Sequence, residues 1–287
     1  MTVEELLGAY RSRPSVVSLS ARLGQPERVH LHLHGLLGSA DAVVAAAVAR
    51  STEVPMLFVL NDREDASYFL NDLEQLLGQE ALLFFPASYK KSFQLDDPDN
   101  GNILLRAEVL SRINRGSRTL VVTYPEAIAE RVVTKRNLEQ NSIELRVGEK
   151  ISTDFITEFL LHHGFESVDF VAQAGEFSVR GGIVDIYSFA NELPYRVEFF
   201  GDEVESIRTF DPESQLSVQA MHHVMIMPNV QTKLLEESRS SFFEFIPGNT
   251  AVWFRDAGAA LSALETGLSK VKQLVAAEKT YEPEQLD

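Results

Sequence analysis

The chain has 287 residues, of which 45% are hydrophobic and 24% charged, and these proportions are typical of a folded globular protein. It contains no cysteine, which excludes disulfides, thiolate metal sites and cysteine nucleophiles. Its formal net charge of −16 argues against strong binding to nucleic acid, because such binding depends on Lys and Arg that neutralise phosphates. No apolar run approaches the about 20 residues that span a bilayer, and the acidic N-terminal segment does not resemble a signal peptide, so we expect a cytoplasmic protein without membrane contact.

The first part of the chain alternates between strand-like and helix-like segments. Short apolar runs predict strands over residues 29–34, 56–60, 81–85 and 119–123. Amphipathic or alanine-rich runs predict helices over residues 39–50, 62–77 and 103–113. Strands separated by helical stretches of about 10–15 residues are typical of βαβ units, so we predict a parallel sheet here.

The pattern changes after residue 127. A short helix is predicted over residues 152–163, and closely spaced strands follow it as far as residue 210. Beyond that point strands are predicted at 224–228 and 250–254 and a helix at 258–277. We therefore predict an α/β protein with three segments, 1–127, 128–210 and 211–287, in which a small α+β domain is inserted into, or follows, a parallel-sheet domain.

The most specific segment of the sequence is GEFSVRGGIVDIY at residues 175–187, followed by PYRVEFFGDEVESIR at residues 194–208. Its β-rich runs are interrupted by Gly-Gly and Gly-Asp turns, which predicts an antiparallel meander. Because strand side chains alternate between faces, Ser178 and Arg180 share one face of their strand, and Arg196 and Glu198 share one face of theirs.

This segment closely resembles a signature shared by UvrB and the transcription-repair coupling factors (Mfd). The resemblance implies a helicase-like first domain that is split by an inserted second domain, and it implies that the second domain docks UvrA. The docking residues implied are Arg180, Arg196 and Glu198, together with Glu176 and Ser178. Ser178 stands where UvrB tends to have a second arginine. The alternative is that the charged residues only pair with one another across strands.

The same resemblance places a P-loop between the predicted strand 29–34 and the helix that follows it. Gly35, Gly38 and Ser39 match the UvrB pattern, whereas Ala40, Asp41 and Ala42 stand in place of its second glycine, its lysine and its magnesium-binding hydroxyl. A P-loop needs that lysine and that hydroxyl to hold the phosphates and Mg²⁺. We therefore predict a degenerate loop that does not bind ATP, and the same holds if it is only a turn between a strand and a helix.

Two other features suggest little further chemistry. The stretch after residue 85 is acidic and poor in aromatic residues, so it lacks the DNA-clamping hairpin that the resemblance would place there. His30, His32 and His34 alternate along one segment, but no carboxylate is placed to complete a metal site, so we predict structural or solvent-exposed histidines and no metal.

Because the loop is degenerate, the chain resembles the N-terminal UvrB-homologous region of the transcription-repair coupling factors more than UvrB itself. The resemblance then implies a non-catalytic recruitment module that binds UvrA in nucleotide excision repair and requires no cofactor. The resemblance also implies autoinhibition through an intramolecular contact with a C-terminal region of a full-length translocase. Two alternatives remain open at this point. One is a UvrB-type DNA-dependent ATPase that binds damaged DNA, and the other is a free-standing adaptor that competes with UvrB for UvrA.

Overall fold

The structure is a computed structural model and describes residues 2–25, 27–78, 82–88, 100–189, 191, 193–228 and 239–278. The chain divides into two compact units. Unit 1 comprises Met1–Ala87, Arg118–Glu130 and Ile246–Asp287, and unit 2 comprises Ser88–Ser117 and Arg131–Phe245. The boundaries predicted at residues 128 and 211 stay predictions. The stretch predicted to lack a DNA-clamping hairpin lies largely outside the described residues.

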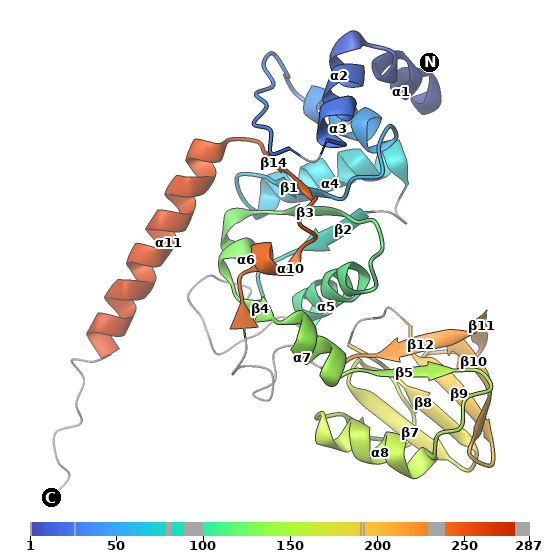
Figure 1. The fold of residues 1–287 in the computed structure, drawn as a ribbon. Coiled ribbons are helices and arrows are strands. Elements are labelled where there is room, and N and C mark those ends of the chain that lie inside the picture. Colours follow the sequence, from blue (N-terminus) through green and yellow to red (C-terminus); the bar gives the residue numbers. More distant parts are fainter. Residues whose placement is uncertain are drawn as a thin grey trace, which may run out of the picture. The chain divides into compact units, whose positions relative to one another are not determined.

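Unit 1 is built on a four-stranded parallel sheet with the strand order β14-β1-β3-β2 (Figure 1). Its strands are β1 (Met56–Val59), β2 (Leu82–Phe85), β3 (Leu120–Thr123) and β14 (Ala251–Phe254). β1, β3 and most of β2 are buried, as expected for strands covered on both faces. The prediction of a parallel α/β sheet is confirmed.

Six helices of the described chain belong to unit 1: α1 (Val3–Arg11), α2 (Pro14–Leu23), α3 (Ala40–Ala49), α4 (Arg63–Leu77), α6 (Pro125–Ala129) and α11 (Ala257–Glu278). α4 begins where predicted because the Asp62 carboxylate accepts a hydrogen bond from the backbone N–H of Asp65. It ends at Gly78, as also predicted. α1 was missed, although Thr2 and Glu5 form a capping box at its start.

One predicted strand of unit 1 is wrong. Residues 29–34 do not pair with any strand of the described chain, and all six are exposed. Their alternating sequence favours an extended backbone, but a strand exists only where a neighbour accepts its hydrogen bonds. His32 and His34 lie on this segment with their ring centroids 4.3 Å apart. No group of three or more potential metal ligands occurs among the described residues.

Unit 2 is built on a six-stranded sheet with the order β11-β10-β9-β8-β7-β6. The strands are β6 (Glu166–Ser167), β7 (Glu176–Arg180), β8 (Ile183–Ile186), β9 (Tyr195–Phe200), β10 (Glu203–Phe210) and β11 (Ser217–Met221). Consecutive strands from β7 to β11 are antiparallel, which confirms the predicted meander, and β6 is added in parallel to β7. The remaining elements of unit 2 are α5 (Asn100–Asn114), β4 (Val132–Val133), α7 (Lys135–Gln140), β5 (Ile143–Arg146), α8 (Thr153–His162), β12 (His223–Ile226), β13 (Arg239–Ser240) and α10 (Phe242–Phe245).

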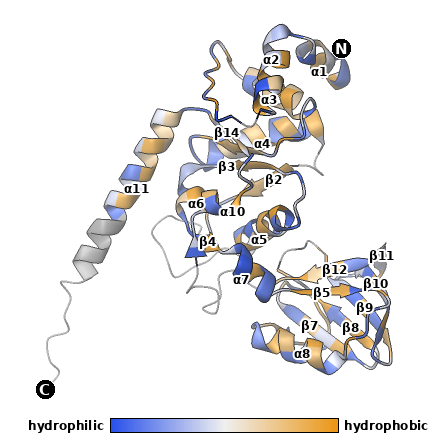
Figure 2. Ribbon diagram, in the orientation of Figure 1, coloured by the Kyte–Doolittle hydropathy of each residue, from blue (hydrophilic) through white to orange (hydrophobic). Residues whose placement is uncertain are grey.

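The hydrophobic core of this domain lies on one face of the six-stranded sheet. α8 contributes Ile156 and Leu160, and the β5–β12 pair contributes Leu145, to a cluster that contains Phe177 and Val197 of the sheet. The ribbon coloured by hydropathy shows polar and apolar residues mixed along the strands, as this one-sided burial requires (Figure 2). The opposite face carries the residues that the sequence singled out.

His163 caps the C-terminal end of α8, and its ring Nδ1 lies 2.8 Å from the carbonyl oxygen of Phe159. Burial of the ring lowers the pKa of His163, although the hydrogen bond to that carbonyl opposes the shift.

Among the described residues, no helix combines the length and the apolar character that a membrane span requires.

Candidate docking site

The sheet of unit 2 turns a charged face away from its core. Strand alternation sends Val197 and Phe199 of β9 into the core and leaves Arg196 and Glu198 on the other side. In the antiparallel register Asp185 of β8 lies opposite Arg196. The outer-face residues discussed below are Ser178 and Arg180 of β7, Asp185 of β8, Arg196, Glu198 and Phe200 of β9, and Ser206 and Arg208 of β10.

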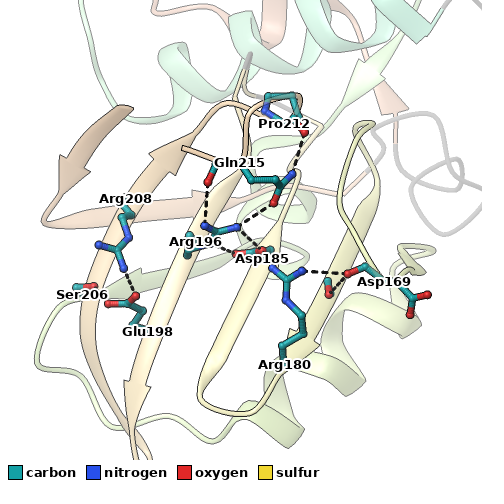
Figure 3. A network of polar contacts seen from close by, with 10 residues as sticks. Asp169, Arg180, Asp185, Arg196, Glu198, Ser206, Arg208, Pro212 and Gln215 are labelled. Atoms are coloured by element: carbon teal, nitrogen blue, oxygen red, sulfur yellow. Dashed lines mark hydrogen bonds and ion pairs between the residues drawn. The ribbon is translucent and has the colours of Figure 1, made fainter. Parts of the chain in front are cut away.

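A buried carboxylate lies at the centre of this face. The Asp185 side chain is only 1% exposed and accepts hydrogen bonds from both predicted docking arginines (Figure 3). The Arg196 Nε and Nη2 atoms donate at 2.7 and 2.8 Å, which is a bidentate contact, and the Nη2 of Arg180 donates to the same carboxylate. The hydrogen bond to Asp185 raises the pKa of Arg196, so the guanidinium stays charged.

Arg196 is fixed from its other side by the turn that links β10 to β11. Its Nη1 lies 3.2 Å from the carbonyl oxygen of Gln215, and its Nη2 lies 3.1 Å from the Gln215 side-chain oxygen. Gln215 has a φ of +60°, a conformation that non-glycine residues adopt rarely. The backbone N–H of Gln215 donates to the Asp211 carbonyl, which holds it in that conformation. The guanidinium also lies 4.3 Å from the centre of the Phe210 ring.

A second ion pair lies beside the first on the same face. Glu198 accepts hydrogen bonds from the Arg208 guanidinium and, at 2.8 Å, from the Ser206 hydroxyl. Both partners of this ion pair are about one third exposed, unlike Asp185. The face therefore contains two separate charge pairs, one with a buried centre and one open to water.

Glu176 and Ser178 have a different environment from the one the sequence suggested. Ser178 is buried and its hydroxyl donates to the Asp169 carbonyl at 3.0 Å. Glu176 accepts hydrogen bonds from the backbone N–H groups of Ala172 and Gln173 at 2.7 and 2.8 Å. Both side chains therefore organise the loop between β6 and β7.

Three residues near this face were not identified from the sequence. Asp185 lay within the signature, but a strand carboxylate is ordinarily expected to be exposed. Phe200 ends β9 with 81% of its surface exposed, and Phe170 lies over Arg180 in the loop before β7. Exposed aromatic side chains beside charged groups are typical of protein interfaces. In the sequence, only their positions could have drawn attention to the two phenylalanines: Phe200 at the end of a strand and Phe170 in a loop.

Residues 35–42, predicted from the sequence to be a degenerate P-loop, lie in unit 1 beside a different charged cluster. The Asp41 carboxylate accepts from the Ala42 backbone N–H at 2.8 Å and from the Arg255 guanidinium, which also binds Asp65. Arg255 carries one positive charge against two carboxylates, so it offsets only part of the charge of Asp41. Asp41 and Ala42 supply neither the lysine nor the hydroxyl of a P-loop.

Comparisons with known proteins identify the domain that bears the charged face. The family model described as "UvrB interaction domain" matches residues 143–231, which include β7 to β11. Three curated proteins, each described as "Transcription-repair-coupling factor", are similar to this chain. The protein from Bacillus subtilis (strain 168) is 29% identical over 254 residues, covering 88% of this chain and 21% of the relative. The protein from Myxococcus xanthus is 30% identical over 225 residues (76% and 18%), and the one from Escherichia coli (strain K12) is 25% identical over 194 residues (67% and 17%).

The chain thus spans about a fifth of the length of the curated relatives it matches. The resemblance stated from the signature is confirmed, both by the family model and by these relatives.

Proposed function

We propose that this chain, a homologue of one segment of the transcription-repair coupling factors that carries a UvrB interaction domain, is a non-catalytic recruitment module that docks UvrA. The observation that carries the proposal is the outer face of the six-stranded sheet. There Arg180 and Arg196 are held in fixed orientations by the buried Asp185 within the matched domain. Pre-organised guanidinium groups suit recognition of carboxylates on a partner, because less side-chain entropy is lost on binding.

The two arginines contribute differently to this proposal. Arg180 is 36% exposed and can meet a partner directly. Arg196 is 15% exposed, and contacts with Asp185 and Gln215 engage all three of its nitrogens. We therefore assign direct contact mainly to Arg180, with the exposed Phe200 elsewhere on the same sheet face, and a supporting role to Arg196.

The same proposal includes the absence of ATP-dependent activity from this region. It is supported by the absence, at Asp41 and Ala42, of the lysine and hydroxyl that a P-loop needs. It also includes weak or no nucleic-acid binding, supported by the net charge of −16, and a cytoplasmic location. The family resemblance further suggests that a C-terminal region of a longer protein covers the docking face until it is released.

Binding to purified UvrA tests the proposal. We expect the wild-type chain to bind and Arg180→Ala to bind about thirtyfold more weakly or worse, since truncating one member of a desolvated charge pair costs about 2 kcal/mol or more. Arg146→Ala is the matched control, because Arg146 is an exposed, ion-paired arginine on β5, outside the six-stranded sheet. Added ATP should leave binding unchanged. A folded wild-type chain that fails to bind UvrA, or an Arg146→Ala loss equal to that of Arg180→Ala, contradicts the proposal.

A further inference from the structure

Phe170 is an unusual residue in the loop between β6 and β7. Its side chain is 66% exposed, although it is large and apolar. The Arg180 guanidinium lies 5.0 Å from the centre of its ring, which is within the range of a cation–π contact. An aromatic ring exposed beside a docking arginine resembles the anchor residues of protein interfaces.

The exposure of Phe170 follows from its neighbours. Val171 is buried, so the backbone at this point directs the next side chain inward and leaves Phe170 outside. On the other side, the Asp169 carbonyl accepts hydrogen bonds from the Ser178 hydroxyl and from Arg180 Nη1, as Figure 3 shows for Arg180. Phe170 thus lies between two anchored residues, Asp169 and Val171.

The rest of the loop is fixed as well. The Glu176 carboxylate binds two backbone N–H groups of the loop, those of Ala172 and Gln173. Gly175 closes the loop with a φ of +90°, and a Cβ added there would lie 2.4 Å from the ring of Phe189, so no larger residue fits without displacing that ring. A loop that is ordered before binding loses little conformational entropy when a partner covers it.

We propose that Phe170 is a further contact residue of the docking face and determines specificity there. This inference rests on the proposed function, because its occupant is the same partner, UvrA. The ring supplies an apolar contact for the partner next to Arg180. Once covered, it also excludes water from the pair formed by Arg180 and Asp185, which strengthens that pair. Glu176 and Ser178 act in this proposal as positioning residues that hold the loop.

The test compares Phe170→Ala with Phe155→Ala in binding to UvrA. Phe155 is the matched control, since it is 53% exposed and lies on α8, which covers the opposite face of the sheet. We expect Phe170→Ala to bind about tenfold more weakly or worse, with most of the change in the dissociation rate, and Phe155→Ala to bind as wild type. Phe170→Tyr keeps the ring and should restore binding.

A second variant separates the ring from the loop that presents it. Glu176→Ala should weaken binding while Phe170 is present and add little to Phe170→Ala, because both changes remove the same contact. Wild-type binding that Arg180→Ala weakens and Phe170→Ala does not would overturn this inference and leave the proposed function intact. Absence of binding by the folded wild-type chain would instead overturn both.

Discussion

The charge network around Asp185 gives a stability prediction that does not depend on a partner. Asp185→Asn keeps the size of the side chain but removes the carboxylate that accepts hydrogen bonds from Arg180 and Arg196. Breaking a fully buried ion pair costs about 3–5 kcal/mol. Arg180 is 36% exposed and can recover hydration, so we expect a loss at the lower end, about 3 kcal/mol.

Glu198→Gln is the control within the same sheet face. It removes a carboxylate that pairs with Arg208, but both groups are about one third exposed, so we expect a loss of about 1 kcal/mol or less. Urea unfolding provides the assay. With a slope of about 2 kcal/mol per molar urea, the Asp185→Asn change corresponds to a midpoint about 1.5 M lower.

The single tryptophan allows the unfolding of unit 1 to be followed separately from that of unit 2. Trp253 lies on β14 in unit 1, so its fluorescence should report a transition that neither variant shifts. Hydrogen exchange in peptides from β8 and β9 reports the sheet of unit 2 and should show the loss. If Asp185→Asn lowers the stability of that sheet no more than Glu198→Gln does, Asp185 is not the centre that holds the arginines, and the reasoning is wrong.

Two further predictions concern single residues outside the charged face. Burial raises the pKa of Tyr195 to about 12, so the neutral phenol stabilises the fold fully below its ordinary pKa of 10.0, and this contribution is lost as the pH rises towards 12. Burial also raises the pKa of Tyr124, so tyrosinate absorbance should show late-titrating groups of which Tyr195→Phe removes one. A late titration that Tyr195→Phe leaves unchanged would contradict the assignment. Arg255→Ala leaves Asp41 and Asp65 without their shared partner and should lower the stability of unit 1 by about 1–2 kcal/mol, as read from Trp253 fluorescence. An unchanged unfolding transition would mean that the ion pairs of Arg255 with Asp41 and Asp65 contribute nothing to the stability of unit 1.

The sequence predicted those parts of the fold that depend on local pattern. The short apolar runs of β1 and β3 were recognisable because a strand covered on both faces is apolar throughout. α4 was predicted closely because Asp62 and Gly78 are residues that begin and end helices. The meander from β7 to β10 followed from its turns and alternation.

The failures occur where structure depends on contacts between distant residues. Residues 29–34 have the alternation of a strand but no strand neighbour in the described chain, and pairing is a tertiary property that a single segment does not encode. Asp185 was missed for the same reason, since its burial depends on two arginines that arrive from adjacent strands. The exposure of Phe170 depends on how its loop is anchored, which no local pattern reveals.

The structure pairs the two arginines internally with Asp185, and whether they also contact a partner stays a prediction. Cross-strand pairing alone would leave exposed pairs of low energy, as Glu198 and Arg208 form. Arg180 and Arg196 instead share one buried acceptor. The carboxylate keeps a bidentate partner if Arg180 reorients, but it loses that contact if Arg196 does. A fixed guanidinium that remains partly exposed is suited to recognition, whereas a fully enclosed one serves stability. Truncating Arg196 should therefore weaken both the sheet and docking, and truncating Arg180 should act mainly on docking.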